Sequence, residues 1–244
     1  MRQKDFSGIG RRWRWLFWET LIIVLGVLIA FAVNDYWSDQ QDRELELQYL
    51  KRVHADLKRD EAWVAGYNKG PMKAKFAALD AITPVVRGRE PVPEDVQAFL
   101  VNVTRGGIGG ASPNYFVNTT TFDDLKATGN LRLILDTDIR GKLSDYYNLY
   151  ENNHGRTVER TTGYFMFVHS ILPAELRQDL SMEAMKEFGV ERALEKILTH
   201  EFRDLLNQEY NFGIFLRGLY AQYAETSAAL AEEVDAHIRA LENQ

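Results

Sequence analysis

The chain of 244 residues contains no cysteine. Disulfide bonds, thiolate metal sites and cysteine nucleophiles are therefore excluded. Positive charge is also in deficit, because the net charge is −6. This balance excludes the broad basic surface on which nucleic-acid binding depends, so we expect no nucleic-acid partner.

Motifs for catalysis and cofactor binding are missing as well. The sequence has no Gly-x-Ser-x-Gly elbow, no His-Glu-x-x-His, and no pair of Glu-x-x-His motifs such as di-metal bundles use. The glycines of residues 106–110 lack the lysine and hydroxyl of a P-loop and the preceding strand of a dinucleotide site, so they indicate a loop. Glu233 and His237 share a helix face, where an exposed pair is expected. We predict no catalytic, cofactor-binding or metal-binding residues, and no enzyme.

Glycine and proline are absent from Val27 to Ala65. The residues after Asn34 are rich in good helix formers, so we expect a helical stalk over residues 38–70 that ends near Gly66 or Gly70-Pro71. An apolar stripe at helical spacing favours packing of this helix on its own domain. The stripe is interrupted by Asp60 and consists of Leu50, Val53, Leu57, Val64 and Tyr67.

One long apolar run stands near the N-terminus. Leu16 to Val33 is apolar except for Glu19 and Thr20, and its 18 residues rise about 27 Å as a helix, close to the thickness of a bilayer core. Tryptophans flank both ends, as in the aromatic belts of membrane interfaces. We predict a transmembrane helix over residues 15–37. The alternatives are a signal peptide cleaved at Ala30-Phe31-Ala32 and a buried core helix.

Charge is distributed unequally about this run. Residues 1–14, the expected cytoplasmic N-terminus, carry five basic side chains and one acidic, whereas acidic side chains dominate after the run. The positive-inside rule then places residues 38–244 outside the cytoplasm. Residues 71–244 show helical periodicity and no strand alternation, so we expect an all-α protein: one transmembrane helix followed by an extracytoplasmic helical bundle.

Helix signals divide the bundle. Apolar spacing predicts helices near 72–86 and 94–103, a short helix capped by Thr121 and ending at Gly129, one long helix from Asp136 to Pro173, a helix over 191–208, and a last helix from about 216 to 241. Asp123, Asp124, Asp136 and Asp138 are expected to cap helix starts. Aromatic clusters near residues 147, 165 and 215 are explained by core packing, or else by a partner surface or an apolar ligand pocket.

The apolar helix has two different faces. Gly26 and Ala30 form a small-xxx-small step that allows another helix to approach closely. The opposite face carries large apolar side chains suited to lipid. We predict that the first face contacts a partner helix; the alternative is that Glu19 merely reaches the headgroups. This candidate interface consists of Arg12, Glu19, Gly26, Ala30, Asn34 and Trp37.

Two stretches resemble a bacterial family of uncharacterised single-pass membrane proteins, catalogued as a domain of unknown function. The first is residues 19–30, followed by Asn34, Trp37 and Tyr49-Leu50; the second is residues 122–131, followed by Ile139-Arg140, Leu143 and Tyr146-Tyr147. The resemblance covers about a quarter of the chain. It implies a bacterial inner-membrane protein with its bulk in the periplasm, and it adds no catalytic residues.

The functional expectation follows from these features. We expect a non-catalytic accessory or scaffolding subunit, with the lipid bilayer and either other membrane subunits or a second copy as partners. The alternative is a sensor or carrier whose periplasmic domain binds a small apolar ligand. A sensor needs a cytoplasmic output, for which the roughly 14 N-terminal residues are too few.

Overall fold

The computed structural model describes residues 9–107, 117–158, 162–172 and 189–243. Every regular element in these ranges is helical, which confirms the all-α prediction. The elements are α1 (Ile9–Tyr67), η1 (Asn68–Met72), α2 (Lys73–Val86), α3 (Val96–Gly106), α4 (Thr120–Ala127), η2 (Asn130–Leu133), α5 (Thr137–Val158), α6 (Gly163–Ile171), α8 (Val190–Ile197) and α9 (His200–Glu242).

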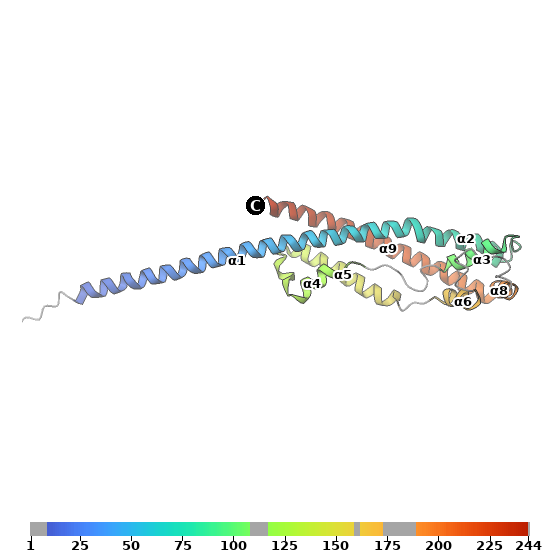
Figure 1. Ribbon diagram of the computed structural model, residues 1–244, viewed down its shortest axis with the longest axis horizontal. Coiled ribbons are helices and arrows are strands. Elements are labelled where there is room, and N and C mark those ends of the chain that lie inside the picture. The colour runs from blue at the N-terminus through green and yellow to red at the C-terminus, as the bar shows by residue number, and fades with distance from the viewer. Residues whose placement is uncertain (1–8, 108–116, 159–161, 173–188, 244) are drawn as a thin grey trace, which may run out of the picture.

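Helix α1 dominates the shape of the molecule. Its 59 residues rise about 90 Å, and its first part projects from the rest of the chain as a single rod (Figure 1). The first buried residue described on α1 is Glu46, after which the predicted stripe packs inside the bundle. The segment expected as a stalk is therefore helical, but from Glu46 onward it is part of the domain.

Helix α1 ends at Tyr67, next to the predicted Gly66, but the helical path does not end there. The chain passes through a π-helical turn, η1, and continues directly as α2. Pro71 has no backbone N–H, and its ring collides with the carbonyl four residues earlier in a regular α-helix. A widened π turn accommodates this local conflict without ending the helix. The chain is consequently helical from Ile9 to Val86.

The bundle contains two hydrophobic cores. The proximal core, next to the projecting part of α1, joins α1, α4, α5 and the part of α9 from Phe212 onward; the distal core joins α2, α3, α6, α8 and the start of α9, as far as Tyr210 (Figure 1). Buried in the proximal core are Leu50, Val53, Leu57, Phe122, Leu125, Leu143, Tyr146, Leu216 and Tyr220, among others. Buried in the distal core are Leu79, Ile82, Phe99, Leu100, Val103, Tyr164, Ile197, Phe202 and Leu206, among others. Helix α9 spans both cores.

Two predicted helices are divided in the structure. The helix expected from Asp136 to Pro173 consists of α5 and α6, and the hydroxyl of Thr162 caps α6 by accepting from the Phe165 N–H at 3.3 Å. The helix expected over 191–208 breaks before Thr199, whose hydroxyl caps α9 by accepting from the Phe202 N–H at 3.3 Å. Apolar periodicity continued across both breaks, whereas the capping threonines mark where each new helix begins.

Candidate functional site

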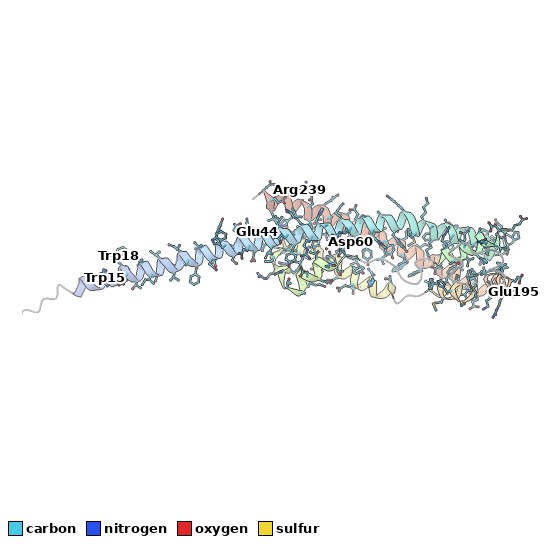
Figure 2. The ribbon with its side chains drawn as sticks, in the orientation of Figure 1. Trp15, Trp18, Glu44, Asp60, Glu195 and Arg239 are labelled. Carbon is cyan, nitrogen blue, oxygen red and sulfur yellow. The ribbon has the colours of Figure 1, made fainter. Side chains whose placement is uncertain are left out.

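The apolar segment of α1 lies outside the bundle. It is long and apolar enough to span a membrane, and none of its most apolar 18-residue window is buried within the molecule. The alternative of a buried core helix is therefore wrong. Trp15 and Trp18 lie at one end of the segment (Figure 2), and Trp37, 63% exposed, lies at the other.

The chain itself does not cover the candidate helix face. Glu19, Gly26, Ala30 and Asn34 are exposed like Trp37, and a Cβ added at Gly26 would meet no atom within 4 Å. Arg12 belongs to α1, but its side chain lies outside the described part of the structure. The face is thus available to a second helix.

Ideal helix geometry relates this face to the exposed side of α1 within the bundle. Thirty-six residues, or ten turns of an α-helix, separate Gly26 from Ala62 and Ala30 from Gly66, so each pair shares one side of α1. Ala62 and Gly66 are exposed. The same spacing relates the opposite, lipid-suited face to the core, since it joins Leu21 to Leu57 and Leu28 to Val64, which are both buried. A helix packed on Gly26 and Ala30 would therefore not collide with the bundle.

The acid that interrupts the α1 stripe is the centre of a buried polar network. Asp60 is 3% exposed; its Oδ1 accepts from the Asn118 N–H at 3.0 Å and its Oδ2 from the Tyr146 hydroxyl at 2.9 Å. One turn earlier, Asp56 accepts from the Asn118 side-chain amide and from the Thr121 hydroxyl. The network connects the start of α4, and through Tyr146 also α5, to α1.

This network corrects one capping prediction. The Thr121 hydroxyl serves Asp56 instead of capping α4, which begins one residue earlier, at Thr120. The predicted end of the helix is confirmed, since Gly129 follows it with φ of 72° in the left-handed region that favours glycine. Capping by Asp136 is also confirmed, because its carboxylate accepts from the backbone N–H groups of Asp138 and Ile139.

Burial raises the pKa of Asp60 to about 6, although the hydrogen bonds from Asn118 and Tyr146 act in the opposite direction. A carboxyl whose pKa is higher in the folded state than in the unfolded state favours folding below its unfolded pKa. That contribution is lost as the pH rises through about 6. The network is therefore least favourable to folding at neutral and higher pH.

Asp60→Asn is expected to remove this dependence, because an amide of the same shape does not ionise. Between pH 5 and pH 7.5 the wild type should lose about 1–1.5 kcal/mol more unfolding free energy than the variant. Urea unfolding of the full chain in mild detergent at the two pH values measures the difference. Equal losses in the two proteins would show that Asp60 does not titrate in this range.

A buried ion pair lies between the two cores. Lys75 of α2 is 1% exposed and Glu209 of α9 is 0% exposed. The Lys75 ammonium donates to the Glu209 carboxylate and, at 2.7 Å, to the Gly106 carbonyl oxygen. Burial lowers the pKa of Lys75, while the charge of Glu209 opposes that shift.

This pair was not predicted from the sequence, although the sequence carries a signal for it. Lys75 stands on the apolar face of α2 between Met72 and Leu79, and Glu209 stands between Leu206 and Phe212 on α9. A charge at a core position of an apolar stripe indicates a buried partner, as Asp60 does on α1.

Gly106, expected in a loop, closes α3 against the distal core. A Cβ added there would lie 2.7 Å from Leu79 Cδ2 and 2.9 Å from the Tyr164 hydroxyl. The close approach explains the glycine sterically and assigns it no phosphate-binding role.

The remaining candidates give no chemical site. Glu233 pairs with Lys142 at 2.7 Å, whereas His237 lies 3.8 Å from the buried Glu46. A single Glu-x-x-His motif occurs at Glu151 to His154, and among the described residues no group of three or more acidic or histidine side chains is arranged to hold a metal ion.

The aromatic clusters serve mainly the interior. In the described ranges the tyrosines of α5, α6 and α9 are largely buried; the fully enclosed ones are Tyr146, Tyr147, Tyr164, Tyr220 and Tyr223. A cleft of about 480 Å³ between α5 and α9 is bordered by charged side chains. Another, of about 390 Å³ beside α1, is lined by Lys51, Arg52 and Arg59, each of which is ion-paired within the chain.

Comparisons with protein-family models, with curated proteins and with solved structures find no match to this chain. The resemblance to a family of single-pass membrane proteins therefore stays a prediction. The structure does show that its motif residues meet in space. Tyr49, Leu50, Phe122, Leu143 and Tyr146 all belong to the proximal core.

Proposed function

We propose that this protein is a non-catalytic, membrane-anchored accessory or scaffolding subunit that packs against other membrane proteins. One observation carries the proposal: a single helix, α1, is apolar and uncovered in its first part and forms the centre of the proximal core in its last part. An apolar helix that continues into a domain core transmits position and orientation between the two.

The helical segment between the apolar part of α1 and the bundle is suited to hold the two at a fixed distance. Between Trp37 and Glu46 the helix has no glycine or proline, so nothing in it provides a hinge. Eight residues of exposed helix, rising about 12 Å, separate the aromatic end of the apolar segment from the first buried residue. A tethered enzyme or ligand carrier gains nothing from so stiff a connection, whereas a subunit that holds its domain over a neighbour requires it.

The helix face that contains Gly26 and Ala30 is where we expect a neighbouring subunit to pack. Gly26 and Ala30 point away from the bundle, so another subunit or a second copy has access to them along the outer side of α1. Close helix approach over small residues is a common basis of association in membranes. Glu19 also favours this arrangement, because a carboxylate that faces protein avoids exposure to lipid.

Gly26→Leu is expected to weaken detergent-stable association at least tenfold, since the larger side chain holds the partner helix away. Membrane insertion should be unchanged, because leucine is at least as apolar as glycine. Crosslinking and size-exclusion chromatography in mild detergent measure the association. Leu28→Ala, on the opposite face, is the matched control and should leave it intact. Indistinguishable complexes from the two variants would remove the face from consideration as an interface.

The proposed location is the bacterial inner membrane, with the N-terminus in the cytoplasm and the bundle in the periplasm. The basic excess of residues 1–14 supports this orientation. A phosphatase reporter fused after Gln244 should be active, because it requires an extracytoplasmic compartment. A fluorescent reporter that matures only in the cytoplasm should remain dark at the same position. The reverse pattern would overturn the orientation.

The second candidate function is a periplasmic domain that binds a small apolar ligand. The abundance of aromatic side chains favours it, but the aromatic side chains of the core pack on one another, as in the stacked rings of Phe122 and Tyr147, whose centroids lie 4.3 Å apart. Lipid analysis of the purified protein separates the two functions. A stoichiometric apolar molecule without a protein partner would favour ligand binding.

A further inference from the structure

The proximal and distal cores meet at a charged layer. Met72 at the end of η1 belongs to the proximal core and Leu79 of α2 to the distal core, and Lys75 of α2 lies between them. On α9, Leu206 belongs to the distal core and Phe212 to the proximal core, with Glu209 between them. The buried ion pair therefore occupies the level at which apolar packing changes from one core to the other.

This layer is held together differently from the cores on either side. Apolar packing is non-directional and tolerates small displacements, whereas a buried ion pair offsets the loss of hydration only while its geometry is kept. Among the described residues, Glu209 Oε2 is buried without a hydrogen-bond partner. The pair is thus incompletely compensated, which lowers the contribution of this layer to stability.

Each of the two helices that cross this layer has a distinctive feature next to Lys75. The first crosses through the π turn η1, which contains Gly70 and Pro71. The second, α9, carries Gly213, where an added Cβ would lie 3.3 Å from Lys75 Cε and 3.1 Å from Phe76 Cζ. A π turn is a site at which a helix can bend. Gly213 allows α9 to approach Lys75 and Phe76 closely, so both features adjoin Lys75.

We propose that the distal half of the bundle moves on the proximal half at a joint formed by η1, Gly213 and the buried Lys75–Glu209 pair, and that this pair holds the joint closed. The distal half comprises α2, α3, α6, α8 and the start of α9, as far as Tyr210. The proximal half stays fixed to α1. The joint would let the distal half move while the proximal half stays fixed to α1. This proposal does not depend on whether the Gly26 face binds a partner.

Native-state hydrogen exchange of the full chain in lipid nanodiscs tests the joint in the wild type. Amides of α2, α3 and α8 are expected to exchange together, at least tenfold faster than the slowest amides of α5 and of α1 after Glu46, because the distal half opens while the proximal half stays folded. A single exchange class across both halves would overturn the proposal.

Variants of the pair test the lock. Lys75→Met should speed exchange of the distal amides at least a further tenfold and leave the proximal amides within threefold of wild type. In Lys75→Met/Glu209→Leu the exchange rate of the distal amides should return to the wild-type value or fall below it, because two apolar side chains at this layer pack together without burying a charge. Equal acceleration in both halves, or no rescue in the double variant, would contradict a lock at this position.

The absence of cysteine allows a direct measurement of the motion. Spin labels at Asn148→Cys on α5 and Arg192→Cys on α8 report the distance between the halves, and labels at Asn148→Cys and Arg239→Cys report within the proximal half; all three sites are exposed. Lys75→Met should broaden the first distance distribution and leave the second unchanged. A first distribution that is narrow in both wild type and variant would exclude the motion.

Discussion

Lys75→Met is expected to lower the free energy that opens the distal half by about 3–5 kcal/mol, because it leaves the Glu209 carboxylate buried without its counter-charge. Glu209 is 0% exposed and has no water-facing alternative in the observed packing. The substitution also frees the Gly106 carbonyl oxygen, which accepts from Lys75 at 2.7 Å. Urea unfolding of the full chain in mild detergent, followed by circular dichroism, measures the loss.

The double variant Lys75→Met/Glu209→Leu separates the stability lost through an unpaired buried charge from the stability lost through altered packing. Replacing both partners by apolar side chains of similar volume is expected to recover most of the lost stability, or to exceed the wild type. Lys58→Met serves as the control, because the Lys58–Glu61 pair lies at the surface and contributes little. If the double variant is as unstable as Lys75→Met, the pair is not the cause of the loss.

Phe202→Ala is expected to destabilise the domain by about 3–5 kcal/mol, since it leaves a large cavity in the distal core. The Phe202 ring is fully buried, with ring centroids 5.2 Å from Tyr164 and 5.5 Å from Phe167. Differential scanning calorimetry and urea unfolding measure the effect, and membrane insertion should not change.

A matched control lies on the same helix. Phe215 is 42% exposed, so Phe215→Ala should cost less than about 1 kcal/mol. Because Phe202 belongs to the distal core, the loss at that site should appear in hydrogen exchange of α3, α6 and α8 before it appears in α5. Comparable effects of the two alanine variants would show that the distal core is not packed as observed.

Features that depend on local sequence were predictable. The apolar run of Leu16 to Val33, the all-helical composition and the α1 stripe follow from hydropathy and spacing, which act within a few turns of the same helix. The end of α4 was likewise predictable, because Gly129 adopts a conformation that other residues avoid. The boundaries at Thr162 and Thr199 were missed, since the helices on both sides of each break continue one apolar pattern.

The sequence by itself determined that one helix is long and apolar enough to cross a membrane, that the remainder forms helices, and which face of each helix is apolar. The tertiary structure alone decided that the chain stays helical through Pro71 into α2, that no other part of the chain covers Gly26, and that Lys75 meets Glu209 across 134 positions of the chain. The physical reason is the distance along the chain over which each interaction acts. Hydropathy and capping act between neighbouring turns, whereas the partner of a buried charge and the free side of a helix depend on which distant segments pack together.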